Sequence, residues 1–144
     1  MPDAVLTWLR DLEQLRRLPQ RYARAIDGRD IDAVGQLLDP EGTVDGARGL
    51  SEVPAYLDGL RRAAPAFESS MHVLGDPLID LEPGADEARM DTYAVVHMLR
   101  AAGSAEDDLV LGIRYLDDVV RRPGGWVIHH RRAVNLWTRT RPAR

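Results

Sequence analysis

Four apolar segments at hairpin spacing occupy the second half of the chain, and they limit the folds that it can adopt. They span about Phe67–Leu81, Ala88–Arg100, Leu109–Arg121 and Trp126–Thr138. The separators are turn sequences: Glu82-Pro-Gly-Ala-Asp86, Gly103-Ser-Ala-Glu-Asp107 and Pro123-Gly-Gly125. Long strands joined by short turns predict an antiparallel meander that curves strongly.

The first half has helical periodicity. From about Ala4 to Gly28, leucines recur at three-residue steps and an apolar stripe continues to Ile26. Pro19 lies inside this stripe and predicts a kink or a break near Leu18. Shorter elements are expected to follow: a helix over Ile31–Leu38, a hairpin around Thr43–Asp45 and a helix from Ser51 to about Ala64.

Helices followed by a strand meander predict an α+β fold, with the helices packed on one face of a strongly curved, mostly antiparallel sheet. A length of 144 residues fits one domain over residues 1–144. The net charge of −4 and the pI near 5.5 argue against general nucleic-acid binding. No apolar run resembles a signal peptide or a membrane span, so we expect a cytoplasmic protein without a membrane partner. Arg131, Arg132, Arg139, Arg141 and Arg144 predict a basic, solvated C-terminal end.

The second strand is apolar on both faces. Tyr93, Val95, His97 and Leu99 share one face, and Thr92, Ala94, Val96 and Met98 share the other. Since helices cover a sheet like this on one side, the opposite face should be polar unless another surface buries it. We expect the face with His97 to line a cavity and the other face to lie in a homotrimer or homodimer interface. Closure of the sheet on itself is the alternative.

Three ionisable residues stand where an apolar residue would be expected: Asp27, His72 and His97. Asp27 ends the first helical stripe, and each histidine lies inside a strand-like apolar run. Buried ionisable groups need partners, and an aspartate that orients a histidine can move protons at neutral pH. The alternative for each histidine is a hydrogen-bonded core residue. No metal is expected, because the chain lacks cysteine and a histidine pair at helical spacing.

Several segments resemble a known family in the right order. The stretch Tyr22-Ala-Arg-Ala-Ile-Asp27-Gly-Arg-Asp30-Ile-Asp32-Ala-Val-Gly-Gln-Leu-Leu38 resembles the opening of SnoaL-like proteins of the nuclear transport factor 2-like superfamily. The superfamily includes scytalone dehydratase, ketosteroid isomerase and polyketide cyclases. Ser70-Met-His72-Val-Leu-Gly-Asp-Pro-Leu78 resembles the family's histidine strand, and the stretch from Gly112 to Ile128 resembles its last hairpin. The resemblance implies a cone-shaped α+β barrel with a deep apolar pocket.

Within the superfamily, the scytalone dehydratase branch is the most similar in its reactive residues. That branch uses an aspartate at the end of the first long helix and a histidine on each of two successive strands. Asp27, His72 and His97 occupy these places. Ile26 replaces the family's tyrosine, while Arg114 and Leu116 fall near the places of its substrate-binding Ser and Asn. The proton-transfer residues are therefore kept and the substrate-binding residues are not.

The resemblance implies a cofactor-independent lyase, a dehydratase that acts on a hydrophobic cyclic or polyketide-like hydroxy-ketone. A polyketide cyclase or a ketosteroid-type isomerase with the same residues is one alternative, and a non-catalytic small-molecule binding protein is another. The expected catalytic residues are Asp27, His72 and His97. A small apolar or aromatic substrate is expected to contact Tyr22, Tyr56, Tyr93, Val95 and Tyr115.

Overall fold

A computed structural model describes residues 2–143 and confirms an α+β fold. Its helices are α1 (Pro2–Asp27), α2 (Ile31–Leu37) and α3 (Val53–Ala63), followed by a 3-10 turn over Ala64–Ala66. The strands are β1 (Leu38–Gly46), β2 (Gly49–Glu52), β3 (Phe67–Leu74), β4 (Leu78–Asp80), β5 (Glu87–Arg100), β6 (Asp108–Arg122) and β7 (Gly125–Arg141). None of the helices in the described range is long and apolar enough to cross a membrane.

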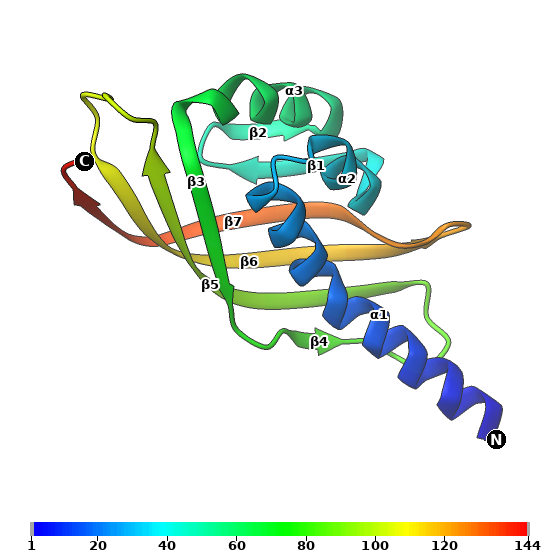
Figure 1. Cartoon of the computed structure of the whole chain (residues 1–144). Helices are drawn as coiled ribbons and strands as arrows, with labels where there is room; N and C mark the ends of the chain where they lie inside the picture. The colour runs from blue at the N-terminus through cyan, green and yellow to red at the C-terminus, as the bar shows by residue number, and fades with distance from the viewer. Residues whose placement is uncertain (1, 144) are drawn as a thin grey trace.

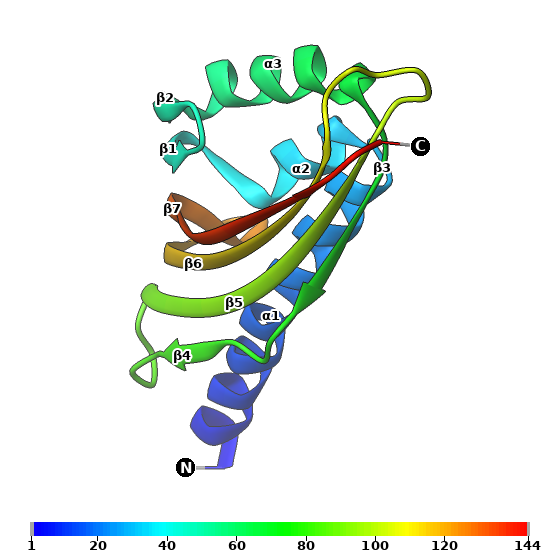
Figure 2. The same cartoon turned by 90° about the vertical axis from the view of Figure 1, so that its left-hand side faces the viewer.

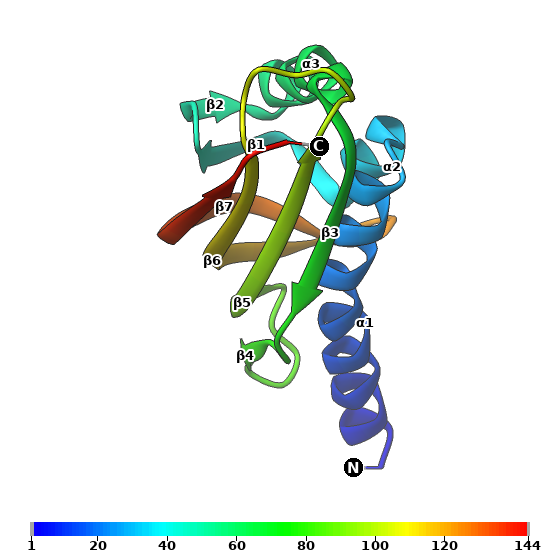
Figure 3. The ribbon, with the colours of Figure 1, turned by 60° about the vertical axis from the view of Figure 1, so that its left-hand side comes forward.

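The strands form one sheet in the order β2-β1-β7-β6-β5-β3, with β4 paired to β5. All pairings are antiparallel except that of β1 with β7. The long strands β5, β6 and β7 bend along their length, and α1 crosses their concave side (Figures 1 and 2). Helix α3 lies beside the β1–β2 hairpin at one end of the molecule (Figure 3). The curved sheet thus half encloses the helices.

Helix α1 buries one stripe against the sheet. Leu15, Leu18 and Tyr22 are at most 4% exposed, and they pack with β6 and β7 residues such as Val119 and Ile128. The helix continues through Pro19, so the predicted break near Leu18 is wrong. A proline inside a helix lowers helix stability by roughly 3 kcal/mol. Burial of the apolar residues before and after Pro19 offsets this loss.

The N-terminal turns of α1 extend past the sheet in all three views (Figures 1 to 3). Leu6 and Leu9, which continue the apolar periodicity, are consequently about half exposed, at 53% and 49%. The buried stripe begins further along the helix, where the sheet lies beneath it. Periodicity therefore identified the helix correctly but overstated its buried length.

Two other boundaries differ from expectation. The first predicted strand is two strands, because residues 75–77 separate β3 from β4 at Gly75 and Pro77. Ser51 belongs to β2, and α3 begins two residues later without a side-chain cap. Pro54 lies in the first turn of α3, where the φ angle fixed by its ring matches that of a helix.

The facing of β5 is the reverse of the prediction. Thr92, Ala94 and Val96 are buried, whereas Tyr93 is 58% exposed on the convex side. The pairing with β3 explains this result, since His72 lies opposite Val96 and directly opposed residues share a face. Alternation showed which residues belong together, but two apolar faces gave no reason to prefer one as the inner face.

A bulge sets the facing of β7. Val119 pairs with Ile128 and Asp118 with His130, so one residue of β7 is left between these pairs. A bulge reverses the alternation that follows it, and it turns Arg131 toward the concave side. At Gly42 a Cβ atom would lie only 2.2 Å from the backbone oxygen of His129, so the neighbouring strand β1 needs a glycine beside the bulge. Arg131 is 1% exposed, which corrects the prediction that it belongs to a solvated basic end.

Candidate active site

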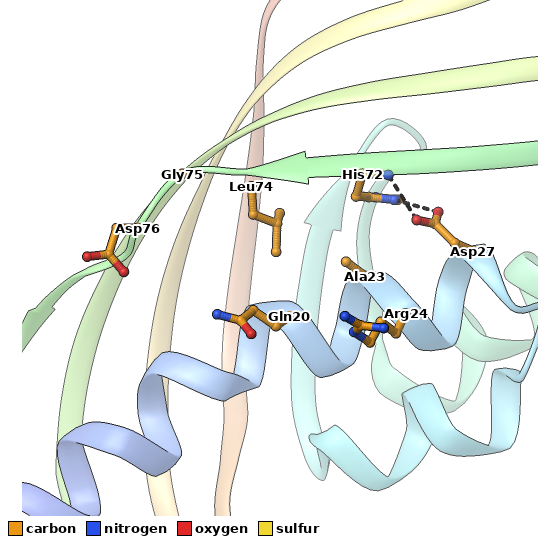
Figure 4. A pocket seen from close by; sticks show the side chains of 8 residues that line it. All are labelled: Gln20, Ala23, Arg24, Asp27, His72, Leu74, Gly75 and Asp76. Carbon is orange, nitrogen blue, oxygen red and sulfur yellow. Dashed lines mark hydrogen bonds and ion pairs between the residues drawn. The ribbon is translucent and has the colours of Figure 1, made fainter.

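Asp27 and His72 meet where the end of α1 approaches β3. The Oδ1 atom of Asp27 lies 2.8 Å from Nδ1 of His72, and Figure 4 shows the two side chains facing one another across this junction. A carboxylate can only accept a hydrogen bond, so Nδ1 carries the proton. The other ring nitrogen, Nε2, is then the basic atom. The arrangement fixes the tautomer of the histidine in the way that proton abstraction requires.

Two further donors hold the Asp27 carboxylate. The hydroxyl of Ser70 donates to Oδ1 at 2.8 Å, and the backbone N–H of His72 donates to Oδ2 at 2.9 Å. Ser70 and His72 are two residues apart on β3 and therefore share its inner face. Because both carboxylate oxygens have donors, Asp27 keeps one orientation toward the imidazole.

Arg29 orients Ser70 in turn. Its Nη1 lies 3.3 Å from the Ser70 hydroxyl oxygen, and its Nη2 lies 3.3 Å from the backbone oxygen of Phe67. Since the guanidinium can only donate, the Ser70 proton is left to point at Asp27. Arg29 has a φ of 59°, a left-handed conformation that favours glycine. The contacts of its side chain give a physical reason for an arginine at this position.

Burial of the imidazole lowers the pKa of His72 below its ordinary value, although hydrogen bonding and charge from Asp27 oppose this effect. The side chain of His72 is 6% exposed. The histidine is consequently neutral at pH 7 and available as a base.

His72 lines a cavity of about 430 Å³ between the concave side of the sheet, α1 and α3. This volume falls within the usual range for small-molecule sites. The wall is largely apolar, with Ile26, Val96, Met98, Leu111, Ile113 and Ala133 among its members. The cavity can therefore hold a ring-sized apolar body next to His72.

Arg131, which lines this cavity, belongs to a buried ion pair. Arg131 donates to both oxygens of Asp117, at 2.7 and 2.8 Å, and both side chains are 1% exposed. Its guanidinium carbon lies 4.2 Å from the ring centroids of both Tyr22 and Tyr115. Burial alone would lower the pKa of Arg131, but Asp117 outweighs burial and holds the pKa above its ordinary value.

One N–H donor of Arg131 has no hydrogen-bond acceptor within the described part of the chain. Its Nη1 atom is buried and has no hydrogen-bond partner among residues 2–143. A buried donor without a partner destabilises the folded protein by roughly 1–3 kcal/mol. Arg131 lines the cavity, so an oxygen atom of a bound molecule is a suitable partner for Nη1.

Two tyrosines provide hydroxyls in the same wall. The hydroxyl oxygens of Tyr22 and Tyr56 are in direct contact, and both residues line the cavity. Burial, followed by the proximity of Tyr22, raises the pKa of Tyr56 well above its ordinary value. The hydroxyl of Tyr56 thus stays protonated, and it can donate to a ligand when the hydroxyl of Tyr22 is the donor within their contact.

The structure brings together only some of the predicted residues. Asp27 and His72 are in contact, and Tyr22, Tyr56 and Tyr115 line the cavity beside His72. His97, Tyr93 and Val95 lie on the convex face of β5, where His97 pairs with Met71 of β3 and Val110 of β6. The expectation that these three residues line the cavity is corrected by the register of β3 and β5.

Sequence reasoning missed Ser70, Arg29 and the inward position of Arg131. Ser70 could have been found, since it is two residues before His72 and must share its face. Asp117 also carried a signal, because it alternates in phase with Ile113, Tyr115 and Val119 and so needs a buried partner. The bulge that supplies this partner has no clear mark in the sequence.

His72 also borders a second, more polar hollow outside the barrel. This groove of about 360 Å³ runs between α1 and β3 and is lined by Gln20, Arg24, Asp27, Leu74 and Asp76, among others (Figure 4). The Asp27–His72 pair therefore separates an apolar cavity from a water-accessible groove. Within residues 2–143, no group of three or more His, Asp or Glu side chains is arranged to hold a metal ion.

Comparison with known families gives a match to the SnoaL-like domain over residues 7–132. No curated protein matches the sequence.

Three solved structures similar to this chain are distant from it in sequence. A protein from Novosphingobium aromaticivorans proposed to be a scytalone dehydratase has 22% identity and a TM-score of 0.79, over 100% of this chain and 94% of the other. A protein of the same organism proposed to be an aromatic ring hydroxylase has 19% identity and a TM-score of 0.82, with 92% and 94% covered. The type3 hexachlorocyclohexane dehydrochlorinase of Novosphingobium barchaimii has 13% identity and a TM-score of 0.77, with 98% and 94% covered. At these identities the similarity establishes the fold alone.

Proposed function

The chain belongs to the SnoaL-like domain family, and on that premise we propose that it is a cofactor-independent lyase that removes water from an apolar cyclic hydroxy-ketone. The observation that carries this proposal is His72, held by Asp27, in the wall of a largely apolar cavity. Similar structures include one protein proposed to be a scytalone dehydratase and one dehydrochlorinase. Both names describe eliminations.

In the proposed reaction, Nε2 of His72 removes a proton from the carbon between the carbonyl and the carbon that bears the hydroxyl. The electrons of that C–H bond form an enolate and then the new C=C bond as the C–O bond breaks. The proton on His72 returns to the departing hydroxyl, which leaves as water. Asp27 stabilises the imidazolium formed between these steps, and a positioned base of this kind contributes roughly a hundred- to ten-thousandfold.

The enolate oxygen needs donors that are already in place. Nη1 of Arg131 is buried without a partner, and the hydroxyl of Tyr56 remains protonated in the same wall. Donors aimed at developing negative charge in a largely apolar cavity stabilise the transition state more than the ground state. His97, which the resemblance implied to be catalytic, lies on the convex face and has no part in this proposal.

The test uses two probe ketones of the same size. One is a tetralone that bears a hydroxyl on the carbon β to the carbonyl, and dehydration converts it to a naphthol. The other is the tetralone without that hydroxyl, which can only exchange its α-hydrogens in heavy water. We expect naphthol formation and exchange with the native chain, and loss of both in the His72→Gln variant.

The two probes distinguish the candidate functions. Exchange without naphthol formation would favour a cyclase or isomerase with the same base. Binding of both ketones without either reaction would favour a small-molecule binding protein and contradict the proposed lyase.

We further propose that the convex face of the sheet is covered by other copies of the chain. Met71, Val73, Tyr93, Leu99 and Trp137 are 42–58% exposed there. Apolar patches of this kind commonly mark interfaces. Light scattering at micromolar concentration should give a dimer or trimer, and Tyr93→Glu should reduce it to a monomer. A native monomer would contradict the proposal.

A further inference from the structure

The cavity carries an excess of positive charge that the proposed reaction does not use. Its charged lining residues are Arg29, Arg48, Arg62 and Arg131, and no Asp or Glu of the described residues lines it. The chain as a whole has a net charge of −4, so this local excess is opposite in sign to the protein. Arg131 is neutralised by Asp117, and Arg29 is occupied with Ser70 and the backbone of Phe67.

Arg48 and Arg62 are the other two cations that line the cavity, and they lie close together. Nη1 of Arg48 is 2.7 Å and Nη2 of Arg62 is 4.0 Å from the point that a Cβ atom would occupy at Gly59. Arg48 donates to the backbone oxygen of Gly59 at 2.8 Å. Neither guanidinium forms an ion pair within the described chain, whereas Arg61 on the same helix pairs with Asp58 and Asp32. Two adjacent cations without a counter-charge repel each other.

The position of this pair gives the cavity two unlike ends. Arg48 and Arg62 are exposed residues at the β1–β2 turn and on α3, which lie side by side at one end of the molecule (Figures 1 and 3). Arg131, with its unpartnered Nη1, is almost completely buried. Apolar side chains line the space between them. The arrangement suits a molecule with an oxygen acceptor at one end, an apolar middle and a negative charge at the other end.

We infer that the physiological ligand is an amphipathic anion: an apolar, ring-sized body whose acidic group is held by Arg48 and Arg62 at the mouth, with an oxygen acceptor directed toward Arg131. The acidic group is a carboxylate, sulfonate or phosphate, all of which satisfy two guanidinium groups. This inference rests on the proposed function only for the identity of the buried oxygen as a ketone. The choice of an anion over a neutral ligand depends on the mouth alone.

The test compares two fluorescent probes with one body. Anilinonaphthalene sulfonate is anionic, and phenylnaphthylamine is the same aromatic body without the sulfonate. The native chain should bind the sulfonate roughly tenfold more tightly than the neutral amine at low ionic strength. Because exposed charges are screened, this preference should largely vanish when salt reduces the Debye length from about 30 Å to about 3 Å.

The variant Arg48→Gln/Arg62→Gln should lose the preference for the sulfonate while binding the neutral amine unchanged. Arg10→Gln/Arg21→Gln is the matched control, since it removes two exposed α1 arginines that do not line the cavity. It should leave both affinities within about twofold. Ala133→Phe fills the cavity and should abolish binding of both probes, which shows that they bind inside it.

Several results would overturn the inference. These are equal affinity of the native chain for the two probes, an unchanged preference in Arg48→Gln/Arg62→Gln, equal loss of both probes in that variant, or sulfonate binding that survives Ala133→Phe. None of these measurements involves turnover. Loss of tetralone chemistry with intact anion preference would contradict the proposed lyase alone, and the reverse result would contradict the anion inference alone.

Discussion

The two faces of the β3–β5 pair show how much the surroundings decide what a histidine does. On the concave face, His72 is held by Asp27 and borders a cavity. On the convex face, His97 lies opposite Met71 among exposed apolar side chains such as Tyr93 and Leu99. Both residues lie inside similar apolar runs of the sequence. A carboxylate at the end of a crossing helix gives His72 a defined tautomer, and His97 has no such partner among residues 2–143.

The sharpest contrast between the two faces is in turnover. His72→Gln should reduce dehydration of the hydroxytetralone by about a thousandfold, because it removes the base. His97→Gln should leave turnover within about twofold. Both variants should be compared by their rates per folded protein, with circular dichroism as the control for folding. Equal losses in the two variants would mean that the convex face takes part in the chemistry.

The buried ion pair of the concave side should also contribute more to the stability of the protein than the ion pair of the convex face. Arg131→Met leaves the Asp117 carboxylate buried without a partner and should lower the free energy of unfolding by roughly 3–5 kcal/mol. Arg114→Met breaks the pair with Asp91 on the convex face, where the Arg114 side chain is 40% exposed. This change should lower the free energy of unfolding by only a small fraction of the loss in Arg131→Met.

Urea unfolding measures both losses. The double variant Arg131→Met/Asp117→Leu should recover most of the stability lost in Arg131→Met, because the unpaired charge is removed along with the arginine. A double variant as unstable as the single one would attribute the loss to packing against Tyr22 and Tyr115.

A smaller effect separates two adjacent serines of β3. Ser70→Ala removes a donor to Asp27 and should lower kcat roughly tenfold with little change in KM, since a hydrogen bond to a charged group is lost. Ser69→Ala, on the opposite face of the strand, should have no effect. If Ser70→Ala raised KM and left kcat unchanged, Ser70 would contact the substrate and would not position Asp27.

Much of the fold was predictable from local sequence patterns. Which residues face the cavity was predictable only in part. Turn sequences between apolar runs located β5, β6 and β7, and the aspartate at the end of α1 pointed to His72. Two features depend on contacts distant in sequence: the register of β3 against β5, and the bulge of β7 beside Gly42. Those contacts placed His97 outside and Arg131 inside, which alternation along single strands could not determine.

The state of the His72 imidazole tests the central claim most directly, because it requires no substrate. In nitrogen-15 NMR spectra assigned with His72→Gln, His72 should be neutral at pH 7 with the proton on Nδ1, and it should titrate below about 6.5 because burial lowers its pKa. Stability should fall as the pH drops through that range, since the unfolded chain then binds a proton that the folded chain does not. In Asp27→Asn the pKa should fall further, because the stabilising charge is removed. A proton on Nε2 at pH 7, or a pKa unchanged by Asp27→Asn, would contradict the proposed base.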